Sequence, residues 1–157
     1  MSHIHDKIDF TVDIFIVNKN KVLLRKHDKY KLWLAVGGNI ELNEDPNQAA
    51  ISEVKEEVGL GIKLHGENKI FLDDNGYYGL IPPKFLNRHR INEDHEHVSL
   101  IFFATPYTDN LITFQEELSE ECKWFNLEEL ENYDIKESIK FHAKKSLEEF
   151  GNENKFF

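Results

Sequence analysis

The chain has 157 residues, of which 40% are hydrophobic, so it suits one globular domain, residues 1–157, with a sizeable core. A net charge of −10 argues against broad binding to nucleic-acid polymers or anionic membranes, and no apolar run reaches the roughly 20 residues that span a bilayer. The single cysteine, Cys122, excludes an intramolecular disulfide, and no signal-peptide pattern opens the chain, so we expect a cytoplasmic protein.

The first quarter of the chain predicts extended structure. Residues 8–17 alternate in polarity and are rich in Phe, Ile and Val, which is typical of a strand. A turn at residues 18–21 precedes a second predicted strand at residues 22–26. Residues 32–36 predict a short extended piece that ends in Gly37-Gly38.

A helix is predicted over residues 46–58. Asp45 can cap its N-terminus, Pro46 suits the first helical position, and Gln48 completes a capping box. Gly59 suits the position just after the last turn, where a left-handed conformation ends many helices. The local sequence therefore specifies both ends of this helix.

One side of the predicted helix is apolar and an adjacent side is acidic. The apolar stripe is expected to pack on the sheet and consists of Ala50, Ile51, Val54 and Val58. Glu53, Glu56 and Glu57 are neighbours at i, i+3 and i+4, so their charges repel one another. A hard cation with oxygen ligands would offset this repulsion. The alternative is an acidic face that only contacts water.

The rest of the chain predicts strands at residues 70–72, 77–81 and 98–104, separated by an irregular polar stretch from Pro82 to about His97. Residues 124–125 predict a last short strand, and residues 127–130 a helical turn. An amphipathic helix is expected over residues 136–150, ended by Gly151, with a core-packing side of Ile139, Ala143, Leu147 and Phe150. Strands mixed with helices predict an α/β fold with helices packed on a mixed sheet.

Residues Gly38 to Leu60 resemble the Nudix box in every defined position except one. The matching residues are Gly38, Glu44, Glu53, Val54, Glu56, Glu57, Gly59 and Leu60, and Ser52 stands where the box has arginine. The resemblance extends more loosely from Ile8 to Leu130. Residues 33–38 are similar to the family's Trp-x-x-Pro-Gly-Gly, with Val36 in place of proline, and residues 117–125 are similar to its acidic loop before a Trp-Phe strand.

The resemblance implies an α/β/α sandwich and a magnesium-dependent hydrolase, with manganese as a second suitable metal. The substrate would be a small molecule in which a nucleoside diphosphate is linked to another moiety, and the diphosphate linkage would be cleaved. The metal ligands would be Glu53, Glu56, Glu57 and the carbonyl group of Gly38. Glu41 and Glu44 would lie at the mouth of the site, with a structural role in the loop as the alternative for Glu44.

Other residues are candidates for proton transfer and substrate binding. The general base would be one of the helix glutamates or a residue of the acidic loop, where we assign it to Glu120 among Glu117, Glu120 and Glu121. Candidates for substrate contact are Glu121, Arg25 towards a phosphate, and Trp33 and Tyr78 towards a base. Surface or core positions are the alternatives for these side chains, and a homodimer remains open.

Ser52 removes the counter-ion that the resemblance places among the box glutamates. The chain could then be a weak enzyme, or a nucleotide-binding regulatory module with a degenerate box. Another cation, such as Arg25 or Lys26, could instead fill the space. A Nudix-fold isomerase lacks support, because Cys122 lies far from the box. A transition-metal site at His89, His95 and His97 is a further possibility beside ordinary surface histidines.

Overall fold

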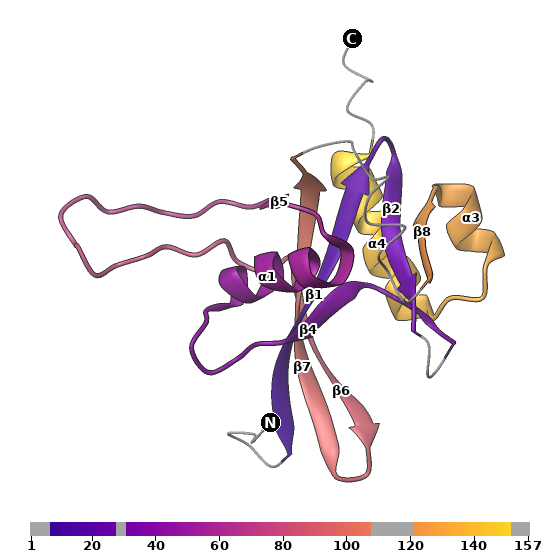
Figure 1. The fold of residues 1–157 in the computed structure, drawn as a ribbon, viewed down its shortest axis with the longest axis horizontal. Helices are drawn as coiled ribbons and strands as arrows, with labels where there is room; N and C mark the ends of the chain where they lie inside the picture. The colour runs from indigo at the N-terminus through magenta and orange to yellow at the C-terminus, as the bar shows by residue number, and fades with distance from the viewer. Residues whose placement is uncertain (1–6, 28–30, 108–120, 152–157) are drawn as a thin grey trace.

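The computed structural model describes residues 7–27, 31–107 and 121–151, for which Figure 1 shows a mixed sheet with helices on both faces. The strands are β1 (Ile8–Asn18), β2 (Lys21–Lys26), β3 (Trp33–Leu34), β4 (Val36–Asn39), β5 (Ile62–Leu64), β6 (Phe85–Asn92), β7 (His95–Pro106) and β8 (Glu121–Phe125). The helices are α1 (Pro46–Val58), α3 (Leu127–Asn132) and α4 (Glu137–Phe150). The expected α/β/α arrangement is confirmed.

Strands β1 and β7 form the centre of the sheet and run parallel, with Asp9 opposite His97 and Val12 opposite Leu100. Strand order along the main path is β3-β2-β1-β7-β5. Three more strands join this path, because β4 pairs with β1, β6 with β7, and β8 with β2. Most of these pairings join residues that are distant in the sequence.

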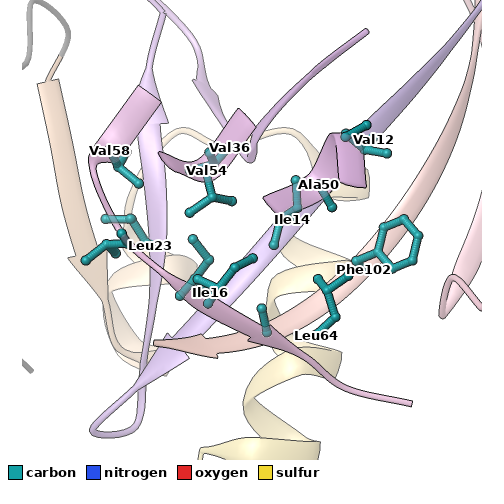
Figure 2. Packing of buried hydrophobic residues seen from close by; sticks show 14 residues of the cluster. Val12, Ile14, Ile16, Leu23, Val36, Ala50, Val54, Val58, Leu64 and Phe102 are labelled. Atoms are coloured by element: carbon teal, nitrogen blue, oxygen red, sulfur yellow. The ribbon is translucent and has the colours of Figure 1, made fainter. Parts of the chain in front are cut away.

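The alternation along β1 distributes its side chains between two hydrophobic clusters. Val12, Ile14 and Ile16 belong to the cluster beneath α1, whose close packing Figure 2 shows. Phe15 and Val17 point the other way and belong to the cluster beneath α3 and α4. All five side chains are at most 1% exposed, so this part of β1 is buried on both faces and lies between the two layers of helices.

Helix α1 has the predicted ends, and its capping details are confirmed. The Asp45 side chain accepts a hydrogen bond from the backbone of Gln48, and the Gln48 side chain accepts one from the backbone of Asp45. Gly59 is left-handed, with φ of 70°. One expected core residue is wrong: Ile51 is 44% exposed, and Ala49 is buried in its place.

Three predictions for the middle of the chain are wrong. Residues 70–72 and 77–81 form no strand and belong to a long loop between β5 and β6, which Figure 1 shows extending from the body of the molecule. The polar stretch after Pro82 contains β6, an outer strand paired to β7. Strand β5 was not predicted, and β4 runs through Gly37-Gly38, where we expected an extended piece to end.

The C-terminal predictions are confirmed. Strand β8, α3 and α4 lie where the sequence places them, and Ile139, Ala143, Leu147 and Phe150 pack in or against the second cluster. Within the described ranges, no helix combines the length and hydrophobicity needed to cross a membrane.

Candidate active site on the first helix

Helix α1 carries three glutamates beside its buried face. Val54 and Val58 are fully buried, and this fixes the rotation of the helix on the sheet. As a result Glu53 and Glu57 lie half-buried next to β4, and Glu56 is exposed. Three carboxylates therefore lie together on one face of α1, as the residue spacing predicts.

The two glycines of β4 allow the backbone to approach these carboxylates closely. A Cβ atom on Gly38 would lie 2.5 Å from Oε2 of Glu53. A Cβ atom on Gly37 would lie 2.0 Å from the backbone oxygen of Val12 and 2.9 Å from Oδ1 of Asp13. The backbone N–H of Gly37 also donates a hydrogen bond to Glu57. Glycine is needed here because any side chain would displace a carboxylate or the strand.

Glu44 shapes the loop between β4 and α1. Its Oε1 accepts a hydrogen bond from the backbone N–H of Glu41 at 3.0 Å. The hydroxyl group of Ser52 lies 3.5 Å from its Oε2 and 3.2 Å from the backbone oxygen of Ala49. The structural role that we considered for Glu44 is therefore present, and Glu41 lies directly beside it in the same loop.

The electrostatics of the cluster oppose full ionisation. Burial raises the pKa of Glu53 to about 7, and the charges of Glu57, Glu56, Glu44 and Glu41 add to this shift in that order. Burial also raises the pKa of Glu57, which Arg25 and Gly37 partly counteract. A divalent cation with oxygen ligands would offset the repulsion among these carboxylates and favour their ionised form. The residues present thus fit a magnesium ion.

Arg25 lies in the acidic cluster as a counter-ion. Its Nη1 donates a hydrogen bond to Oε2 of Glu57, and the two side chains are only 17% and 19% exposed. Arg25 comes from β2, which pairs with β1 and β8, so the sheet positions it against α1. This contact agrees with the hypothesis that Arg25 is a counter-ion for the box glutamates in place of the missing arginine. Ser52 itself faces Glu44.

Asp13 is a candidate site residue that the sequence did not reveal. It lies on β1 opposite Gly37, receives a hydrogen bond from Ser99, and has its pKa raised to about 6, first by burial and then by the charge of Glu57. Ser99 in turn contacts the hydroxyl group of Thr11 at 2.7 Å. In the sequence, the one indication of this role is that Asp13 lies between apolar residues of a predicted strand.

The proposed substrate-binding residues do not all come together. Trp33 is 7% exposed and packs edge-on against Phe125 and Tyr133, which is the core position weighed as its alternative. Tyr78 is 82% exposed on the loop between β5 and β6. The two hydrogen bonds between Asn47 and the backbone of Ile81 tie that loop to the first turn of α1.

Most of the acidic stretch at residues 117–121 lies outside the described part of the chain. Glu117 and Glu120 lie outside the described residues. Glu121 is the first residue of β8, opposite Lys26 in the register with β2. Arg25 lies opposite Cys122 in the same register, so β8 is adjacent to the strand that carries Arg25.

Comparisons with known proteins place these observations in one family. A family model described as the NUDIX domain matches residues 7–149. Among solved structures, a hydrolase of the NUDIX family from Clostridium perfringens is 35% identical, with a TM-score of 0.76, and the match covers 89% of this chain and 96% of that chain.

Two more distant structures share the fold. A NUDIX hydrolase from Nitrosomonas europaea is 14% identical, with a TM-score of 0.63, over 92% of this chain and 91% of that chain. A UDP-X diphosphatase is 16% identical, with a TM-score of 0.60, over 94% of this chain and 64% of that chain. No curated protein sequence matches the chain significantly.

Proposed function

Because the chain belongs to the Nudix family and is a hydrolase of diphosphate bonds, we propose that its substrate is a nucleoside diphosphate linked to another moiety. We further propose that the reaction uses Mg²⁺, with Mn²⁺ as a substitute. The observation that carries the proposal is the carboxylate cluster around Gly38, in which burial and four neighbouring charges raise the pKa of Glu53 to about 7.

In this proposal Glu53, Glu56, Glu57 and the carbonyl group of Gly38 hold the metal. A bound divalent cation would supply neutralisation of the phosphate charges and activation of water. Glycine at position 38 leaves room for the carboxylate of Glu53 directly against β4. Arg25 favours the ionised form of Glu57 against the effect of burial and orients it, because its guanidinium group donates to that carboxylate.

Proton transfer and substrate contact are assigned to residues around this cluster. Glu120 remains our candidate for the general base, with the helix glutamates as the alternative. Tyr78 is offered for base stacking, because its ring is exposed on a loop that Asn47 fastens to α1. Glu41 and Glu121 complete the candidates for substrate contact. For Arg25 the contact with Glu57 supports a counter-ion role more strongly than a phosphate contact.

A substrate panel tests the proposal. Purified protein with magnesium would be incubated with nucleoside triphosphates, dinucleoside polyphosphates and nucleotide sugars, and the release of phosphate and nucleoside monophosphate would be measured. We expect turnover of at least one class, and none when magnesium is chelated. Inactivity across the whole panel would contradict the proposal.

The alternative, a regulatory module, predicts a different outcome of the same panel. Calorimetry would then show tight nucleotide binding without any product release. The absence of the box arginine at Ser52 favours this alternative, and the Arg25–Glu57 pair opposes it because one box glutamate retains a cationic partner.

A further inference from the structure

A second group of metal-ligating side chains lies on the central sheet, apart from the glutamates of α1. Asp9 of β1 and His95 and His97 of β7 each offer one ligand atom, and these three atoms lie within 4.8 Å of one another. All three residues are half-buried. Figure 1 shows the start of β1 beside the β6–β7 hairpin, at the end of the sheet where the hairpin turns.

The pairing of the strands explains why these side chains converge. Asp9 lies opposite His97 in the parallel register of β1 and β7, so their side chains share one face of the sheet. His95 is two residues from His97 on the same strand and therefore shares that face. The rings of His95 and His97 have their centroids 5.2 Å apart. The strand pairing thus places the three donor side chains next to one another on one face.

The charge at this place favours a cation. Oδ2 of Asp9 lies 3.0 Å from Nε2 of His95, with the two side chains 12% and 20% exposed. The neighbouring Glu96 alternates to the other face of β7, where it is paired with Arg88 and Lys7. One carboxylate and two imidazoles therefore occupy a partly dehydrated position together.

We infer that Asp9, His95 and His97 form a binding site for a divalent transition-metal ion such as Zn²⁺. Two imidazole nitrogens and one carboxylate oxygen make a ligand set typical of zinc, and three protein ligands leave a position for water. Magnesium prefers oxygen ligands alone, so the two sites select different metals. The bound ion would join the start of β1 to β7 and stabilise that end of the sheet.

Zinc titration tests the inference on the full chain without an affinity tag. Isothermal calorimetry would be run in millimolar magnesium, so that the glutamates of α1 are occupied. We expect one zinc ion per chain, a higher melting temperature with zinc, and an affinity that falls by about tenfold or more in His97→Ala and in Asp9→Asn. Equal melting temperatures of the parent and Asp9→Asn in chelator would show that the variant is folded.

A matched control separates this site from other histidines of the chain. His3 and His5 also lie near the N-terminus in the sequence, so a His3→Ala/His5→Ala variant is titrated in parallel. The inference predicts that this variant binds zinc like the parent. It is overturned if His97→Ala binds zinc as tightly as the parent, or if the parent binds no zinc.

Discussion

Gly37 and Gly38 both lack room for a Cβ atom, but the obstacles differ in kind. At Gly38 the obstacle is the end of the flexible Glu53 side chain, and at Gly37 it is the backbone oxygen of Val12. We predict that Gly38→Ala keeps a melting temperature close to that of the parent and loses about tenfold or more of its activity, because Glu53 must move. Gly37→Ala should instead destabilise the fold by several kcal/mol.

Thermal melting and initial rates on both variants check this contrast. Equal activity of Gly38→Ala and the parent would show that the position of Glu53 is not critical. A Gly37→Ala variant as stable as the parent would contradict the close approach of β4 to β1.

Ser52 lies beside Glu44, which raises the pKa of Glu53 through its charge. An arginine at position 52 could pair with Glu44 and with Glu56 one turn later. We predict that Ser52→Arg raises the melting temperature of the metal-free protein and increases turnover several-fold at saturating magnesium. Ser52→Gln serves as the uncharged control.

The combination of Ser52→Arg with Glu44→Gln identifies the partner. Most of the stabilisation should disappear in that double variant if Glu44 accepts the new guanidinium group. A Ser52→Arg protein that is less stable and no faster than the parent would show that the existing cation, Arg25, already compensates for the serine.

Strand β2 and helix α1 are connected by the Arg25–Glu57 pair, which is largely shielded from water. We predict a coupling free energy of about 1–3 kcal/mol between the two side chains. The measurement is a double-mutant cycle with Arg25→Gln, Glu57→Gln and the double variant, each unfolded by urea at pH 8 in chelator. Additive effects of the two substitutions would mean that the pair does not stabilise the fold.

The elements that the sequence predicts correctly are those with local signals. The capping box of Asp45 and Gln48, together with Gly59, gives both ends of α1 without reference to the rest of the chain. The Gly37-Gly38 pair appeared to end a strand, whereas pairing with β1 continues β4 through it. That pairing is a tertiary interaction, and local propensity contains no information about it.

In the loop between β5 and β6 the sequence predicts strands that the structure lacks. Residues 70–72 and 77–81 are rich in β-forming side chains but have no strand to pair with, and Leu72 is 95% exposed. Strand β6 has polar and charged residues on an outer position, so its sequence resembles a loop. Whether these residues form a strand depends on the strands available for pairing and on burial, and both are set by the whole fold.

The candidate site could be predicted in part for the same reason. The spacing on one helix brings Glu53, Glu56 and Glu57 together, so the sequence alone was sufficient. Arg25 and Asp13 reach the cluster only through strand pairing, and their exact partners, Glu57 and Gly37, required the structure.

The stability of the whole molecule should depend on pH through the raised acids. The folded pKa values of Glu53, about 7, and Asp13, about 6, exceed their ordinary values of 4.5 and 3.8. Protonation of these two groups therefore stabilises the folded state. Its contribution to the free energy of unfolding is complete below pH 4 and is lost as the pH rises through 6 and 7. We predict that Glu53→Gln/Asp13→Asn raises the melting temperature of the metal-free protein more at pH 8 than at pH 5.

The stabilisation of the folded protein by magnesium should have the opposite pH dependence, since it involves the same carboxylates. Because magnesium competes with protons for the carboxylates, its stabilisation of the parent should be greater at pH 8 than at pH 6. Melting curves in chelator and in magnesium measure both effects. A parent and double variant with identical pH dependence would contradict the assigned pKa shifts.

The most direct test of the metal site is the rate at which Glu56→Gln hydrolyses the substrate identified in the panel, at saturating magnesium. Glu56 is exposed, so its replacement should leave the fold unchanged, and Glu148→Gln on α4 serves as a matched control on an exposed helix. The three-glutamate metal site predicts a rate at least about 100-fold below that of the parent, with the control unaffected. A Glu56→Gln protein that hydrolyses the substrate as fast as the parent would contradict the site.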